Sequence, residues 1–189
     1  MSVTGCSAST TPAKGILMTE NVAGDQTITS RQALEVAYAA IEGHSNWAGP
    51  GDVIVQPQEK YFEVVFRFLA APSRNLDRLV RVRVDSSSGK AIKVEDQEQA
   101  EAPEDRRMPA EWENFITARQ AYEIALKAMD GFENYDKSGR LTILIRESIY
   151  YVTFPLLRRP GTGSRSADYA MQVLVDARSG TVRKVFTAS

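Results

Sequence analysis

The chain has 189 residues, of which 43% are hydrophobic and 25% charged, with 23 basic side chains against 24 acidic ones. This composition is typical of globular proteins, and the length suffices for one domain or two small ones. One Cys and one His exclude a disulfide framework and a zinc site built from these residue types. No run of about 18 apolar residues predicts a membrane-spanning helix.

Residues 1–26 are rich in Ser, Thr, Ala and Gly and are predicted to form a flexible tail. Within them, Val3-Thr4-Gly5-Cys6-Ser7 is similar to the end of a bacterial lipoprotein signal, which makes Cys6 the candidate site of lipid attachment. Only Met1 and Ser2 precede this match, so the apolar part of such a signal is missing. Either the match is fortuitous in a cytoplasmic protein, or the true start lies upstream and the protein is an extracytoplasmic lipoprotein of the cell envelope. We favour the second.

A segment of the sequence occurs twice. Residues 28–43 and residues 116–131 align at an offset of 88 positions, with nine identities in 16 positions. Further along, Val-Arg-Val-Asp-Ser-Ser-Ser-Gly at residues 82–89 recurs as Val-Leu-Val-Asp-Ala-Arg-Ser-Gly at residues 173–180, at an offset of 91. Internal repetition of this kind predicts that one structural unit is present in two copies.

Each copy is predicted to begin with an amphipathic helix. Thr29 and Gln32 have the spacing of a capping box, in which two side chains satisfy backbone amides at a helix start, and the second copy repeats the pair. Apolar residues follow at helical spacing and predict one buried face per helix. These residues are Ala33, Val36, Ala37, Ala40 and Ile41 in the first copy and Ala121, Ile124, Ala125, Ala128 and Met129 in the second. Gly43 and Gly131 are expected to end the helices.

After each helix, apolar and polar residues alternate, which predicts β-strands. Strands are expected near residues 53–56, 61–69, 79–85 and 91–94, and near residues 141–146, 150–157, 169–176 and 182–186. Asp85 and Asp176 begin turn sequences that end in Gly, so each copy is expected to close with a hairpin. The predicted fold class is α+β, with two tandem αββββ repeats at residues 27–95 and 115–189 that are related by approximate two-fold symmetry. In each repeat one helix packs on an antiparallel sheet.

The sheet face turned away from the helix is only half polar in both copies. A four-stranded sheet with one helix leaves this face and two edges open. Either the two copies pack against each other, or the face binds a partner. The expected partner contacts are Tyr61, Arg67, Arg81, Arg83 and Tyr151, with Arg158 and Arg159 in an adjacent Gly-rich loop.

Residues 96–114 are predicted to form an exposed linker between the copies. They hold seven acidic side chains against two basic ones and include Pro103 and Pro109. Residues 115–189 hold 11 basic and seven acidic side chains. This modest excess falls short of the basic surface that phosphate binding requires, so we expect no nucleic acid as a partner.

The pattern of each copy resembles a known family. A helix of the form Ile-Thr-x-x-Gln-Ala-x-Glu-x-Ala, followed by strands and a terminal Val-x-Val-Asp-x-x-Ser-Gly hairpin, is similar to the PepSY or PepSY-like domain, here in tandem. The resemblance implies a small α+β module of secreted or envelope proteins that binds or restrains partners such as peptidases and has no catalytic residues. The family usually occurs once per chain or joined to an enzyme or membrane segment, and neither accompanies the copies here. The layout is also similar to that of small immunity proteins that neutralise secreted bacterial toxins.

No set of residues marks a catalytic or metal site. His44 has Glu42 and Asp52 nearby in sequence, as a base oriented by a carboxylate would, but no nucleophile accompanies them, and we interpret His44 as a loop residue. Asp85 and Asp176 lack the alternating oxygen ligands of a calcium loop, and turn formation explains both. We therefore expect neither enzymatic activity nor a cofactor or metal.

Trp47 and Trp112 lie outside the predicted helix and strand faces. An exposed Trp often anchors an interface, but we expect these two to cover an end of the core. The sequence thus predicts a non-catalytic protein-binding or inhibitory module of PepSY-like type that acts in the cell envelope on a protein or peptidase partner. The alternative is an immunity protein that neutralises a secreted bacterial toxin.

Overall fold

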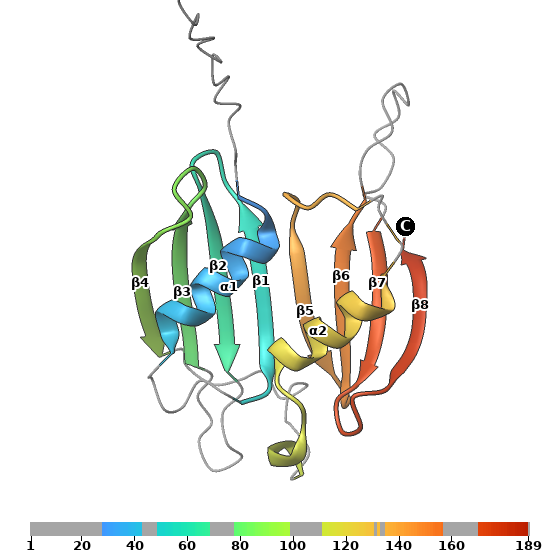
Figure 1. Ribbon diagram of the computed structural model, residues 1–189. Coiled ribbons are helices and arrows are strands. Elements are labelled where there is room, and N and C mark those ends of the chain that lie inside the picture. Colours follow the sequence, from blue (N-terminus) through green and yellow to red (C-terminus); the bar gives the residue numbers. More distant parts are fainter. Residues whose placement is uncertain are drawn as a thin grey trace, which may run out of the picture.

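A computed structural model describes residues 28–42, 49–68, 78–98, 111–130, 132, 135–156 and 170–188. Within these ranges the chain has a mixed α+β fold, with two α-helices and one antiparallel sheet of eight strands (Figure 1). The helices are α1 (Ser30–Ile41) and α2 (Ala118–Ala128), with a short 3-10 helix, η2 (Trp112–Asn114), before α2. The strands are β1 (Gly51–Pro57), β2 (Tyr61–Phe68), β3 (Arg78–Asp85), β4 (Ala91–Glu98), β5 (Leu141–Arg146), β6 (Ile149–Pro155), β7 (Ala170–Asp176) and β8 (Val182–Ala188).

The strands lie in the order β4-β3-β2-β1-β5-β6-β7-β8. Neighbours in this order are also neighbours in the chain, except at the centre, where β1 pairs with β5 and places Val53 opposite Ile143. The two four-stranded segments therefore do not pack face to face, which was one of the two arrangements that the sequence left open. They join edge to edge into one sheet.

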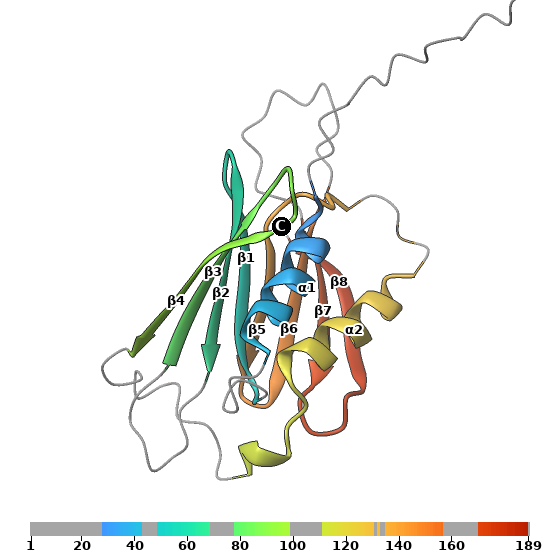
Figure 2. The ribbon, with the colours of Figure 1, turned by 60° about the vertical axis from the view of Figure 1, so that its left-hand side comes forward.

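Both helices lie on the same side of the sheet (Figure 2). α1 packs on β1 to β4 and α2 on β5 to β8. The core lies between the helices and the sheet because every second residue of the inner strands points that way. Its fully buried members include Ala33, Leu34, Ala37, Val64, Phe66, Val80, Val82, Ala121, Ala125, Ile143, Tyr150, Val152 and Val173. The opposite side of the sheet, called the outer face below, carries none of the described helices.

The predicted helix starts are confirmed. Thr29 Oγ1 accepts a hydrogen bond from the Gln32 amide at 3.2 Å, and Gln32 Oε1 accepts one from the Thr29 amide at 2.8 Å. Thr117 and Gln120 form the same capping box. α1 ends at Ile41 and α2 at Ala128, while the two Gly residues expected to end them lie outside the described ranges.

The region expected to be a linker begins within an edge strand. β4 runs to Glu98 and sets Asp96 opposite Val80 of β3. The strand therefore continues into the acidic segment that the sequence analysis assigned to the linker. Most of the remaining linker lies outside the described residues. At its end, Trp112 of η2 is half-buried and packs against the core cluster, as expected for a residue that covers the core.

The two predicted turns are confirmed as well. Gly89 and Gly180 have φ angles of +65° and +68°, a conformation that favours Gly over other residues. In the first turn, Asp85 Oδ1 accepts hydrogen bonds from the Ser88 amide at 2.7 Å and the Ser87 amide at 3.2 Å. The role of the Asp85 carboxylate is therefore to stabilise the turn.

The hydrogen bonds to Asp85, led by the one from the Ser88 amide, lower the pKa of the carboxyl group to about 2. A lowered pKa in the folded state means that the ionised carboxylate stabilises the fold above its unfolded pKa of about 4 and loses this effect as the pH falls toward 2. We expect the stability advantage of the wild type over Asp85→Asn to be constant above pH 5 and to shrink between pH 4 and pH 2. Urea unfolding at a series of pH values measures this difference, and an advantage that does not change with pH would contradict it.

Candidate functional site

The outer face brings together the five described residues that the sequence singled out as partner contacts. On β2, Phe62, Val64 and Phe66 are buried toward the helices, so Tyr61 and Arg67 lie on the opposite side. The same alternation on the neighbouring strands places Arg81, Arg83 and Tyr151 there too. All five side chains are half-buried. The other predicted residues, Arg158, Arg159 and Cys6, lie outside the described ranges, as do His44 and Trp47.

Pairing across the sheet arranges the outer face in rows. One row runs from Glu95 on β4 through Arg81 and Val65 to Ile54 on β1. In the second half of the sheet, Tyr151 lies between Leu144 and Leu174. The half-buried apolar residues of the face include Ile54, Val65, Leu144, Ile149, Leu174 and Phe186. Arginine and tyrosine interspersed with aliphatic residues are the composition of a protein-binding surface.

Two arginines of β3, Arg81 and Arg83, each have a guanidinium nitrogen for which the described residues supply no acceptor. Arg83 lies over the Tyr61 ring, with its guanidinium carbon 5.4 Å from the ring centroid, and its Nε is 3.9 Å from Glu63 Oε1. Among the described residues, the Nε atoms of Arg81 and Arg83 are buried and have no hydrogen-bond partner. A buried donor without an acceptor costs free energy. Both arginine side chains are only half-buried, so a partner carboxylate would meet the accessible part of each guanidinium group.

A buried carboxylate lies where the two halves of the sheet meet. Asp52 is 6% exposed and is the register partner of Arg67 on β2. Its Oδ1 accepts a hydrogen bond from the Ile145 amide at 2.8 Å and lies 3.4 Å from Arg146 Nη1. The side chain thus continues the β1–β5 pairing beyond its last main-chain contact. The sequence suggested Asp52 only as a companion of His44, because nothing in it indicates that β1 and β5 are neighbours.

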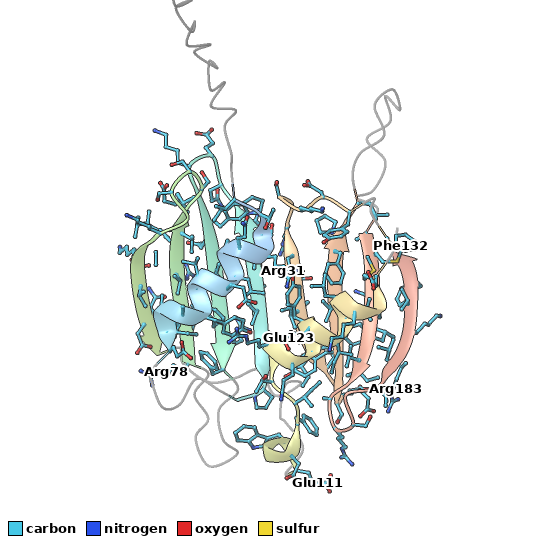
Figure 3. The ribbon with its side chains drawn as sticks, in the orientation of Figure 1. Arg31, Arg78, Glu111, Glu123, Phe132 and Arg183 are labelled. Atoms are coloured by element: carbon cyan, nitrogen blue, oxygen red, sulfur yellow. The ribbon has the colours of Figure 1, made fainter. Side chains whose placement is uncertain are left out.

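The helix side contains a feature that the sequence did not predict, a cavity of about 650 Å³ between the start of α1 and the second half of the sheet. Three aromatic rings line one wall: Phe154 is 6.0 Å from Tyr122 and 5.8 Å from Tyr135, centroid to centroid. Burial raises the pKa of the Tyr122 phenol. Figure 3 shows Arg31, which also lines the cavity, at the start of α1.

The cavity depends on contacts between distant parts of the chain. The Ser30 amide donates a hydrogen bond to the Lys137 carbonyl at 2.7 Å, and the Ser30 hydroxyl donates one to the Gly139 carbonyl. A salt bridge of 2.8 Å between Glu35 and Arg119 connects the two helices. A lining that combines aromatic rings with charged side chains of both signs suits a small amphiphilic group, but it includes none of the five predicted contacts.

The described residues contain neither a cluster of metal ligands nor a membrane-spanning helix. No three His, Cys, Asp or Glu side chains in these ranges gather closely enough to hold a metal ion. Neither α1 nor α2, nor any other helix described, has the length and apolar character needed to cross a bilayer.

No protein-family model matches the chain, and no curated protein does. Among solved structures, the chain is similar to the crystal structure of a protein from Clostridium difficile 630 described as a "putative lipoprotein". The two chains share 15% sequence identity, the similarity covers 88% of this chain and 97% of that one, and the TM-score is 0.42. Any proposal about function therefore rests on the residues themselves.

Proposed function

We propose that the protein is a non-catalytic binding module that recognises a protein partner through the outer face. The observation that carries this proposal is the side of the eight-stranded sheet on which none of the described helices lies, and which carries Tyr61, Arg67, Arg81, Arg83 and Tyr151. Proteins seldom leave a half-apolar surface of this extent without a use for it. The face extends across eight strands, which gives a folded partner room to bind.

The chemistry of the arginines favours a partner with carboxylate groups at the contact. Arg81 and Arg83 lie two residues apart on β3, and none of the described residues accepts a hydrogen bond from the Nε atom of either one. A partner carboxylate would form charge-assisted hydrogen bonds with the accessible part of these half-buried guanidinium groups, and the adjacent Tyr61 ring would add apolar contact area.

We further propose that the halves are two copies of a PepSY-like unit. The nine identities between residues 28–43 and 116–131 support this, as do the matching capping boxes and the matching Gly turns. The resemblance makes a peptidase or another envelope protein the expected class of partner, and restraint or inhibition of that partner the expected effect. Lipid attachment at Cys6 would hold the module at a membrane.

Site-specific photocrosslinking in the source cells tests this proposal. We expect a benzophenone amino acid in place of Tyr151 to form an adduct with a partner protein, which mass spectrometry identifies. The charge reversal Arg81→Glu with Arg83→Glu should reduce the adduct by more than about tenfold, because arginines at the centre of an interface contribute strongly to affinity.

The matched control carries the same benzophenone at Lys127, an exposed residue of α2 on the helix side. This position should give no adduct. An adduct from Lys127 and none from Tyr151 would place recognition on the other side of the sheet, and an adduct from Tyr151 that survives the charge reversal would contradict the role of the arginines.

A further inference from the structure

The two edge strands lie at opposite ends of the sheet, and both expose apolar side chains. Ile92 and Val94 of β4 are 59% and 43% exposed, and Val182 and Val185 of β8 are 41% and 40% exposed. Apart from Phe132, no other large hydrophobic residue in the described ranges is this exposed. No described strand pairs with the outward main-chain groups of either edge, and such groups can pair with a strand of another molecule.

The topology makes the two edges compatible with each other. All neighbouring strands are antiparallel and their number is even, so β4 and β8 run in opposite directions, as Figure 1 shows. A second copy that is shifted along the sheet without rotation therefore sets its β4 antiparallel to β8 of the first copy. The helices of both copies then lie on the same side of one longer sheet.

The charges of the two edges are opposite. β4 carries Lys93 with Glu95, Asp96 and Glu98, whereas β8 carries Arg183 and Lys184 without any acidic residue. Charges on an edge strand ordinarily keep copies of a protein apart. Here they oppose the pairing of two like edges and favour the pairing of unlike ones.

One register of this pairing sets apolar residues opposite each other and, in the next pair, sets an acidic residue opposite a basic one. Val94 and Val185 lie on the helix side, since their register partners on β3 and β7 are the buried Val82 and Val173. With Val94 opposite Val185, the next antiparallel pair is Glu95 with Lys184, both on the outer side.

The pair that follows in this register is Asp96 with Arg183. Each already has an ion-pair partner within its own copy, Arg78 for Asp96 and Asp176 for Arg183. Figure 3 shows Arg78 and Arg183 at opposite ends of the sheet. The contact between copies would thus connect two existing ion pairs into one network.

We propose that copies of this chain associate head to tail, β4 of one copy pairing with β8 of the next, in the register that sets Glu95 opposite Lys184. The contact joins two different surfaces, so it does not close on itself after two copies and extends to longer assemblies as concentration rises. This inference goes beyond the proposed function, because the partner is a second copy and the contact lies at the edges.

Sedimentation velocity of the full chain over a range of concentrations tests the proposal. We expect the wild type to form species larger than a dimer that dissociate as salt is raised. Glu95→Lys or Lys184→Glu alone should weaken association by about tenfold, because each replaces an attractive cross-strand pair with a repulsive one. The double variant with both changes, and an equimolar mixture of the two single variants, should regain association, since opposite charges face each other again.

Lys127→Glu makes the same change of charge as Lys184→Glu but on α2, away from both edges, and should leave association unchanged. Circular dichroism checks that each variant is folded, and the salt dependence of the wild type tests the electrostatic part without any variant. A chain that stays monomeric at every concentration would overturn the proposal. A dimer that grows no further, or association that neither charge reversal weakens, would overturn it as well.

Discussion

Gly51→Ala is expected to destabilise the protein by about 3 kcal/mol, the upper part of the range for an overpacked position. Gly51 opens β1 and pairs with Phe68 of β2. A Cβ atom at this position would lie 2.3 Å from the Arg67 carbonyl oxygen and 3.4 Å from Phe68 Cα. These are backbone atoms of the paired strand, so no side-chain rotation can relieve the clash, and β1 must move away from β2.

The loss should appear as a melting temperature about 6 to 12 °C below that of the wild type, by circular dichroism or calorimetry. Gly49→Ala is the matched control, because its added Cβ would meet only the Trp112 ring, at an ordinary contact distance of 3.7 Å. Equal melting temperatures for the two variants would show that β1 has room to move at Gly51.

Asp52→Ala has the second largest expected effect, a loss of about 2 kcal/mol in the free energy of unfolding. The substitution removes the acceptor of the Ile145 amide, which then remains buried without a partner. It also leaves Arg146 without the carboxylate beside it. Both groups belong to β5, so the substitution weakens the pairing between the two halves of the sheet.

Asp52→Asn separates the two contributions, because the amide oxygen can still accept the hydrogen bond while the negative charge is gone. We expect this variant to lose less than about 1 kcal/mol, the scale of an ion pair with a partly exposed partner. Hydrogen exchange at the Ile145 amide should accelerate in Asp52→Ala and change little in Asp52→Asn. If both variants lose stability equally, the charge and not the hydrogen bond holds the two strands together.

The helices, strands and turns were predictable because their signals are local. Thr29 with Gln32 specifies a helix start by a hydrogen-bonding pattern that spans three residues, and Asp85 with Gly89 specifies a turn in the same way. Alternation along β2 indicates which side chains share a face, so the placement of Tyr61 and Arg67 opposite the core followed from the sequence alone. Each of these features depends on neighbours in the chain.

The arrangement of the two halves was not predictable on the same basis. An alternating pattern states which way a side chain points but not which strand lies beside it. The sequence left open whether the outer faces of the halves pack together or stay open to a partner, and it did not predict that the halves join by their edges. The burial of Asp52 and the cavity beside Tyr122 both follow from the β1–β5 pairing and the packing of α1 against residues 135–139. The full length of β4 was missed for another reason, because its acidic residues are typical of a linker.

The central pairing of β1 with β5 also accounts for most of the loop-closure entropy that the strands lose when the sheet forms. Among the described strands, every other pairing joins consecutive strands, whereas Val53 and Ile143 close a loop of about 90 residues. The conformational entropy lost in bringing distant segments together is therefore concentrated in this one closure. That cost grows only with the logarithm of loop length, and doubling the loop would add about 0.6 kcal/mol. The connection between the halves can thus vary in length at little thermodynamic expense.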